Sequence, residues 1–195
     1  MNDQPNLREF INEVSSFTDE AAPSAKASGA ALPVLGTVIE IAGSGSRVRM
    51  DASILAALAS HKDTSVAMSG QVGSQVKMMV GRAWLIANIR TLSVGDNDEI
   101  LGNVDFLGEG SRDATGRLNN FRRGVTRYPI PGCDVLPVTT EDMRAIFAAS
   151  DEPNIEIGTV YPTDDIRGAL YVDPMLSKHF AGLGSTGTGK STAVA

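Results

Sequence analysis

A glycine-rich segment near the end of the sequence most constrains the fold of this chain. Gly184 is followed by four residues and then by Gly189, Lys190 and Ser191, which matches the phosphate-binding pattern G-x-x-x-x-G-K-[ST]. Glycines let several backbone N–H groups curl closely around a nucleotide triphosphate. Lys190 can then reach the β- and γ-phosphates, and the hydroxyl of Ser191 can hold Mg²⁺. The segment therefore predicts a nucleotide site at the start of a helix.

The residues around this segment favour a nucleotide-binding loop over a flexible glycine-rich tail. Residues 180–183 form a short apolar run, as a buried parallel strand would, although Gly182 packs less well than a β-branched residue. A nucleotide-hydrolysing α/β domain also needs a second acidic strand and a residue that positions water, and the sequence ends at Ala195. We expect a truncated α/β domain without catalytic residues, an N-terminal piece of a longer protein that does not hydrolyse nucleotide alone.

Strand-like runs dominate the residues before this loop. Apolar and β-branched residues alternate or cluster in runs separated by glycine-rich turns, which predicts strands at 34–41, 47–50, 72–80, 83–94, 99–107 and 133–138. Strands at this spacing favour a small, closed or nearly closed β-barrel, with a two-sheet sandwich as the alternative. The predicted fold class is mainly β: a barrel with one or two short helices, followed by the first strand and phosphate loop of a RecA-like domain.

Two helices and three divisions of the chain complete the prediction. Residues 51–60 read as a helix capped by Asp51, and residues 139–149 read as a helix capped by Thr140, with a strand following at 155–160. Apolar residues at 1–17 recur every three or four positions, which indicates an amphipathic helix before a linker rich in Ala, Ser, Gly and Pro. This helix would dock on a partner or fold back on its own domain. The predicted domains are therefore an N-terminal segment (1–31), a barrel (32–165) and the start of a phosphate-loop domain (166–195).

One stretch is strongly basic in a chain whose formal net charge is -6. It offers a surface for phosphate, either of DNA or of a neighbouring subunit's nucleotide. The competing interpretation is a solvated loop that pairs with acidic residues of adjacent subunits. The five arginines are Arg112, Arg117, Arg122, Arg123 and Arg127.

Other residues restrict the chemistry further. His61 and His179 lie far apart with no cysteine or second histidine at ligand spacing, so we predict no metal site apart from the Mg²⁺ of the nucleotide. Cys133 is the single cysteine, which excludes an intramolecular disulfide and fits a reducing compartment. No apolar run reaches the length of a membrane span and the N-terminus does not resemble a signal peptide, which favours a cytoplasmic protein without a membrane partner.

Three acidic residues lie on the approach to the loop. We interpret Asp164, Asp165 and Asp173 as turn and capping residues rather than as catalytic acids.

A strand-rich barrel that leads directly into a phosphate loop resembles the HerA-type ATPases of the HerA/FtsK superfamily. Residues 35–38, 128–135 and 157–160 carry this resemblance in the barrel, and residues 172–192 carry it most strongly at the loop. Gly182 departs from the bulky aliphatic residue expected in that family.

The resemblance implies a ring-shaped, usually hexameric motor that moves double-stranded DNA with ATP and Mg²⁺. The barrel would support ring assembly and dock a nuclease or other effector, while most DNA contacts would lie in the ATPase core. Gly187, Gly189 and Lys190 would cradle phosphates, Ser191 would bind the metal, and Thr192 would lie near the α-phosphate. The complete set of predicted nucleotide-binding residues is Gly184, Ser185, Thr186, Gly187, Thr188, Gly189, Lys190, Ser191 and Thr192.

Other classes remain open at this point. Rotary ATP synthase subunits also place a barrel before their nucleotide site, and secretion ATPases share the style of loop but need membrane anchoring. A non-enzymatic oligomerisation or docking module is the further alternative.

Overall fold

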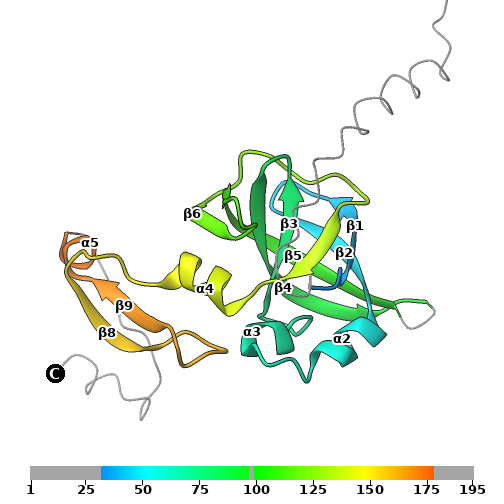
Figure 1. The fold of residues 1–195 in the computed structure, drawn as a ribbon. Coiled ribbons are helices and arrows are strands. Elements are labelled where there is room, and N and C mark those ends of the chain that lie inside the picture. The colour runs from blue at the N-terminus through cyan, green and yellow to red at the C-terminus, as the bar shows by residue number, and fades with distance from the viewer. Residues whose placement is uncertain (1–31, 97–98, 178–195) are drawn as a thin grey trace, which may run out of the picture. The chain divides into compact units, whose positions relative to one another are not determined.

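The computed structural model describes residues 32–96 and 99–177, which form nine strands and four short helices (Figure 1). The strands are β1 (Gly36–Ile41), β2 (Gly45–Asp51), β3 (Gln75–Val80), β4 (Ala83–Val94), β5 (Glu99–Arg112), β6 (Leu118–Arg123), β7 (Asp134–Pro137), β8 (Asn154–Thr159) and β9 (Arg167–Tyr171). The helices are α2 (Ala52–Leu58), α3 (Thr64–Ala67), α4 (Thr140–Phe147) and α5 (Val172–Leu176). The helix predicted at 1–17, the linker after it and the strand and loop predicted at 180–192 lie outside the described residues. Among the described helices, none combines the length and apolar character needed to cross a membrane.

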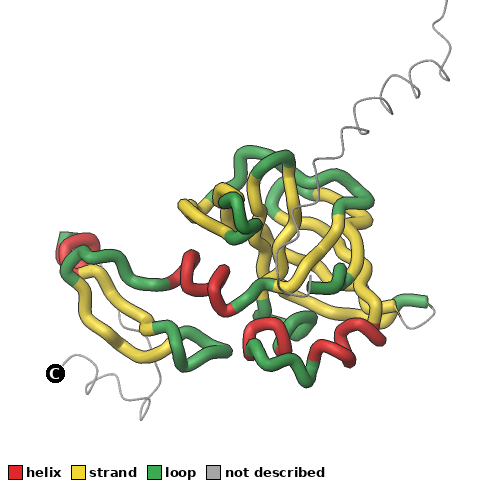
Figure 2. The backbone as a smooth tube through the Cα atoms, in the orientation of Figure 1, coloured by secondary structure: helices red, strands yellow, loops and turns green. Residues whose placement is uncertain are grey.

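Six strands close into a barrel, which confirms the predicted fold class and excludes the two-sheet sandwich. Neighbouring strands follow the order β2-β1-β7-β3-β4-β5, and antiparallel pairing of β2 with β5 joins the two ends. This closing pairing runs from Gly45 opposite Asp105 to Asp51 opposite Glu99. Strand β6 pairs with β5 beside the ring. The strands wrap around a common interior in Figure 2.

The barrel wall is apolar on both faces because part of its outside is covered. In β4, Leu85 and Ile89 pack into the interior cluster, whereas Trp84 and Ile86 belong to a second cluster with Met143 of α4. All five side chains are nearly inaccessible to solvent. Burying a large apolar side chain stabilises the fold by roughly 1.5–3 kcal/mol, so the outer cluster fixes α4 against the barrel.

The predicted helices are present, with one correction to their caps. Asp51 caps α2 as predicted, since its carboxylate accepts hydrogen bonds from the backbone N–H groups of Ser53 and Ile54. Thr140 as the cap of α4 is wrong: Thr139 is the N-cap, and its side chain exchanges hydrogen bonds with the backbone and side chain of Asp142. This reciprocal capping box satisfies two backbone donors at once, which a cap at the next residue would not do. Helix α3 was not predicted because one turn is too short for a recognisable period.

Strand β6 corrects the interpretation of the basic stretch as a loop. Residues 118–123 pair with the extended end of β5, from Leu118 opposite Arg112 to Arg123 opposite Gly108. Only Leu118 is buried in this strand, because β6 lies at the sheet edge with one neighbouring strand. Its polar sequence therefore lacks the alternation that marks a half-buried strand.

The strand predicted at 155–160 is confirmed as β8, and it forms a separate hairpin with β9. The predicted domain boundary after residue 165 falls between these two strands. The division into residues 1–31, 32–165 and 166–195 stays a prediction.

Candidate functional site

The predicted nucleotide-binding residues 184–192, including the metal ligand Ser191, lie outside the described residues, so their roles stay predictions. The structure does describe the segment that leads to them. Tyr171 Oη accepts a hydrogen bond of 2.8 Å from the backbone N–H of Ser150, and Val172 N–H donates to the carbonyl of Pro153 at 3.0 Å. These contacts fasten the end of β9 to the chain before β8 and so fix where α5 begins.

The acidic residues of this approach serve turns and a helix end. Asp164 accepts a hydrogen bond from Thr159 Oγ1 at 3.3 Å, and Asp165 N–H donates to Thr163 Oγ1 at 3.1 Å. Asp173 lies in the first turn of α5, where a carboxylate favours the helix dipole. The positions of Asp164 and Asp165 agree with the interpretation as turn residues, whereas α5 has no side-chain cap and Asp173 is not its N-cap residue.

A buried polar cluster centres on Asp142, which is 2% exposed. Its Oδ2 accepts hydrogen bonds from Lys77 Nζ at 2.6 Å and from the Thr139 backbone N–H and Oγ1 at 3.0 and 2.9 Å. Its Oδ1 lies 3.3 Å from the backbone N–H of Leu118. One carboxylate thus connects β3, β6 and the start of α4. Because four donors already bind this carboxylate, it stabilises the packing of these elements and is not a free acid or base.

Lys77 is held on a second side by an aromatic ring. Its Nζ lies 4.9 Å from the centre of the Trp84 ring, within cation–π range. Trp84 Nε1 donates to the carbonyl of Gly116 at 2.9 Å, which ties the β5–β6 turn to the same cluster.

Asp63 connects two helices that are distant in sequence. Its carboxylate caps α3 through the backbone N–H groups of Ser65 and Val66, at 2.9 and 3.4 Å. It also accepts hydrogen bonds from the N–H and Oγ1 of Thr140 at 3.0 and 2.7 Å. Despite the desolvation that partial burial imposes, these donors lower the pKa of the carboxyl. The start of α4 is therefore fixed by two carboxylates.

Glu109 forms a third polar cluster, on β5. Its carboxylate accepts hydrogen bonds from the Arg122 guanidinium and from the N–H and Oγ1 of Thr126, the latter two at 3.0 and 2.8 Å. The Arg122 bond contributes most to lowering the pKa of Glu109, followed by the two Thr126 bonds, and the pKa falls from 4.5 to about 2. The carboxylate stays ionised across the physiological range and anchors the segment that follows β6.

The arginines of the basic stretch divide between paired and unpaired groups. Arg117 pairs with Glu141 at 2.7 Å and Arg122 pairs with Glu109, both within the same chain. Arg112 lies over the Trp84 ring, 5.9 Å from its centre. For Arg123 and Arg127 no ion pair exists within the part of the chain that the structure describes.

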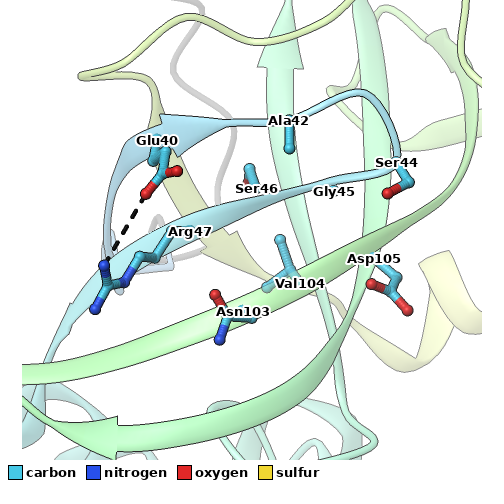
Figure 3. Close-up of a pocket in the computed structure, with 9 residues that line it drawn as sticks. All are labelled: Glu40, Ala42, Ser44, Gly45, Ser46, Arg47, Asn103, Val104 and Asp105. Atoms are coloured by element: carbon cyan, nitrogen blue, oxygen red, sulfur yellow. Dashed lines mark ion pairs between the residues drawn. The ribbon is translucent and has the colours of Figure 1, made fainter.

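A hollow of about 190 Å³ lies between the β1–β2 hairpin and β5 (Figure 3). Glu40 and Arg47 face each other across its side at 4.0 Å, and Asp105 on the other side pairs with Arg90. Ser46 Oγ is buried there without a hydrogen-bond partner. Because both carboxylates already have cationic partners, the hollow lacks a free acid–base pair.

His61 and Cys133 have local structural contacts. His61 Nδ1 accepts a hydrogen bond from Asp63 N–H at 3.1 Å, next to the start of α3. The half-buried Cys133 thiol donates to the carbonyl of Met79 at 3.3 Å, and burial raises its pKa, so little reactive thiolate forms. Within residues 32–96 and 99–177, no group of His, Cys, Asp and Glu side chains could hold a metal ion.

Sequence reasoning missed the roles of Lys77, Asp142 and Glu109. Lys77 did carry a signal, because it stands alone among the apolar residues of β3. A charge in the middle of a strand with apolar residues on both sides calls for a buried partner. Nothing in the local sequence indicates that this partner is Asp142, 65 positions away.

Comparison with known proteins adds the family context. The sequence model of the family described as "Helicase HerA, central domain" matches residues 155–195. The predicted relationship to HerA-type proteins is confirmed. The match starts in β8 and includes the whole Gly184–Ser191 segment.

A curated relative is the DNA double-strand break repair helicase HerA of Pyrococcus furiosus, which is 33% identical over 103 residues. The alignment covers 53% of this chain and 17% of the relative. The chain therefore spans about a sixth of the length of the relative that it matches.

Proposed function

We propose that this chain is the N-terminal part of a HerA-like motor that uses ATP to move along double-stranded DNA. The observation that carries the proposal is the match of the HerA central-domain model to residues 155–195, a range that includes the phosphate-binding pattern. The helicase name of the relative supports DNA as the substrate. The same match favours this function over a rotary or secretion-type ATPase and over a non-enzymatic docking module.

The donor groups of residues 184–192 fit a nucleotide triphosphate with Mg²⁺. Three glycines free the backbone N–H groups to approach phosphate oxygens, and the Lys190 ammonium supplies a compact positive charge. The Ser191 hydroxyl is the kind of hard oxygen ligand that Mg²⁺ prefers. Bound ATP–Mg²⁺ supplies the free energy of phosphoryl transfer, and the chain's own residues orient the phosphates.

The barrel has a different role in this proposal. It serves assembly into a hexameric ring in the cytoplasm and docks a nuclease or other effector. Helix α4 covers one part of the outer face of the barrel, so we place such contacts on other parts of its surface. The molar mass of the complete gene product in solution, by light scattering with and without ATP, tests the ring.

ATP hydrolysis by the complete gene product tests the motor itself. We expect double-stranded DNA to stimulate hydrolysis, and Lys190→Ala to abolish it, because the substitution removes the cation that contacts the β- and γ-phosphates. Lys178→Ala is the matched control, since it makes the same change before the predicted loop, and it should keep DNA-stimulated activity.

Two results would contradict the proposal. Hydrolysis that does not respond to DNA at any salt concentration would exclude the translocase. The absence of hydrolysis, with an intact folded ring, would favour the docking module.

A further inference from the structure

The antiparallel topology gathers four connections at one end of the barrel. Strands β1 and β3 end there and β2 and β4 begin there, so the β1–β2 and β3–β4 turns are neighbours of the β5–β6 turn and of the segment after β6 (Figure 1). Contacts join them: Tyr128 Oη donates to the carbonyl of Gly43 at 3.2 Å, and Trp84 Nε1 donates to that of Gly116.

Three exposed arginines lie at this end: Arg82 in the β3–β4 turn, Arg112 at the end of β5, and Arg127 in the segment after β6. The Arg127 guanidinium extends over the β3–β4 turn, where a methyl group on Gly81 would lie 3.6 Å from its Nη1, next to Arg82. The Arg112 guanidinium lies over the Trp84 ring, and among the described residues its N–H groups donate no hydrogen bond to another side chain or carbonyl. We call these three residues the arginine end.

The carboxylates near the arginine end offset its charge only in part. Asp113 accepts hydrogen bonds from Thr115 N–H, Thr115 Oγ1 and Arg117 N–H within its own turn. Glu109 and Glu141 are bound by Arg122 and Arg117, as described above. The donors to Asp113 are neutral, so it keeps its negative charge, and together with the exposed Asp134 at the start of β7 it gives this end two carboxylates against three guanidiniums. No ion pair involves the arginine end among the residues that the structure describes.

At the opposite end of the barrel most of the described carboxylates are already bound, whereas Asp96 in the β4–β5 turn is exposed. Asp51 and Asp63 there cap α2 and α3, and Glu99 pairs with Arg49 at 3.1 Å. A contact between copies through these carboxylates would have to break their bonds, and Asp96 is the described acid at this end that is available without that cost. A polyanion supplied from outside the chain needs no such exchange, and the planar guanidinium fits phosphate oxygens well.

We propose that the arginine end of the barrel binds the phosphate backbone of double-stranded DNA without reading its sequence. The choice of DNA as the polyanion rests on the proposed function. The observation that the three arginines have no ion pair among the described residues is independent of that function. The barrel thus contributes its own DNA contact, separate from the ATPase core.

The test is DNA binding by the 195-residue chain, followed by fluorescence anisotropy of a labelled duplex at several KCl concentrations. Arg82→Gln/Arg127→Gln should lower the slope of log affinity against log salt by about 2, since each phosphate contact contributes about 0.9 to that slope. Arg49→Gln/Lys62→Gln removes the same charge at the other end of the barrel and should leave the slope unchanged. Two duplexes of different base composition should give equal affinities.

Three results would overturn the inference. These are no DNA binding at low salt, equal loss in both double variants, or unchanged DNA binding with reduced self-association in the Arg82→Gln/Arg127→Gln variant. The last result would assign the arginines to a contact between copies. Because this assay needs no ATP, its result can be distinguished from a failure of the proposed function. DNA-stimulated hydrolysis without DNA binding by the barrel would refute only this inference. Binding by the barrel without hydrolysis would refute only the motor.

Discussion

Replacing Asp142 by asparagine perturbs the buried ion pair with Lys77 while keeping the size of the side chain. The Lys77 side chain is 10% exposed, so its ammonium would remain buried without a counterion. The asparagine amide also offers one acceptor oxygen where the carboxylate receives four donors. Breaking a buried pair from one side costs about 3–5 kcal/mol. Since a domain is stabilised by about 5–15 kcal/mol in total, this one change removes a large share.

Lys77→Met should cost less, about 1–3 kcal/mol, because Asp142 would keep its backbone and threonine donors. The double variant should be more stable than the sum of the two single losses predicts. A coupling of about 1–3 kcal/mol between contacting residues is the expected sign of a direct interaction.

Urea unfolding of the 195-residue chain measures these free energies, and the molecule supplies its own probe. Trp84 is the single tryptophan, it is buried, and it lies beside Lys77. Glu141→Gln is the matched control, because Glu141 is the neighbour of Asp142 but pairs with Arg117 at the surface, where an ion pair contributes about 1 kcal/mol or less. A loss below about 1 kcal/mol for Asp142→Asn, or additive single losses, would refute the reasoning.

Two further changes test other parts of the barrel. The pKa of Glu109 is about 2 in the folded chain against 4.5 ordinarily, so its stabilisation is present above pH 4.5 and is lost as the pH falls towards 2. Glu109→Gln should therefore reduce the loss of the free energy of unfolding between pH 4.5 and pH 2 by on the order of 1–2 kcal/mol. This magnitude is discounted because Arg122 is exposed to solvent. An unchanged dependence on pH would exclude this role. Gly36→Ala would place a methyl group 1.8 Å from the carbonyl oxygen of Arg49, so we expect a loss of about 1–3 kcal/mol in urea unfolding. Gly43→Ala, with no atom within 4 Å, should be neutral; equal losses would contradict the overlap argument.

Local pattern predicted most barrel strands within a few residues. Long runs such as β4 carry enough β-branched and apolar residues to be recognised without knowing their partners. Strand β6 was missed because its side chains are mostly solvent-exposed, and β5 was predicted too short because its end is rich in Gly and polar residues. The pairing of β2 with β5 that closes the ring depends on distant residues and has no local signal.

The candidate sites likewise differ in whether local sequence or distant residues determine them. The phosphate-binding pattern of residues 184–192 is contiguous, so spacing alone predicts it. Lys77 and Asp142 meet only after the barrel has formed and α4 has packed on it. The arginine end likewise depends on topology, since Arg82 lies far in sequence from Arg112 and Arg127.

Asp63 has a consequence for how force passes along the chain. The same carboxylate holds the first turns of α3 and α4, and α4 precedes the hairpin that leads to the predicted nucleotide segment. A pull on α4 that lifts its first turn would break the bonds from Thr140 to Asp63 and separate Asp142 from Lys77, while Asp63 would keep its bonds to α3. These bonds would have to break together, which makes the junction between barrel and hairpin behave as a cooperative unit under load. A force applied from the predicted nucleotide segment would therefore be transmitted to the barrel wall until these bonds break.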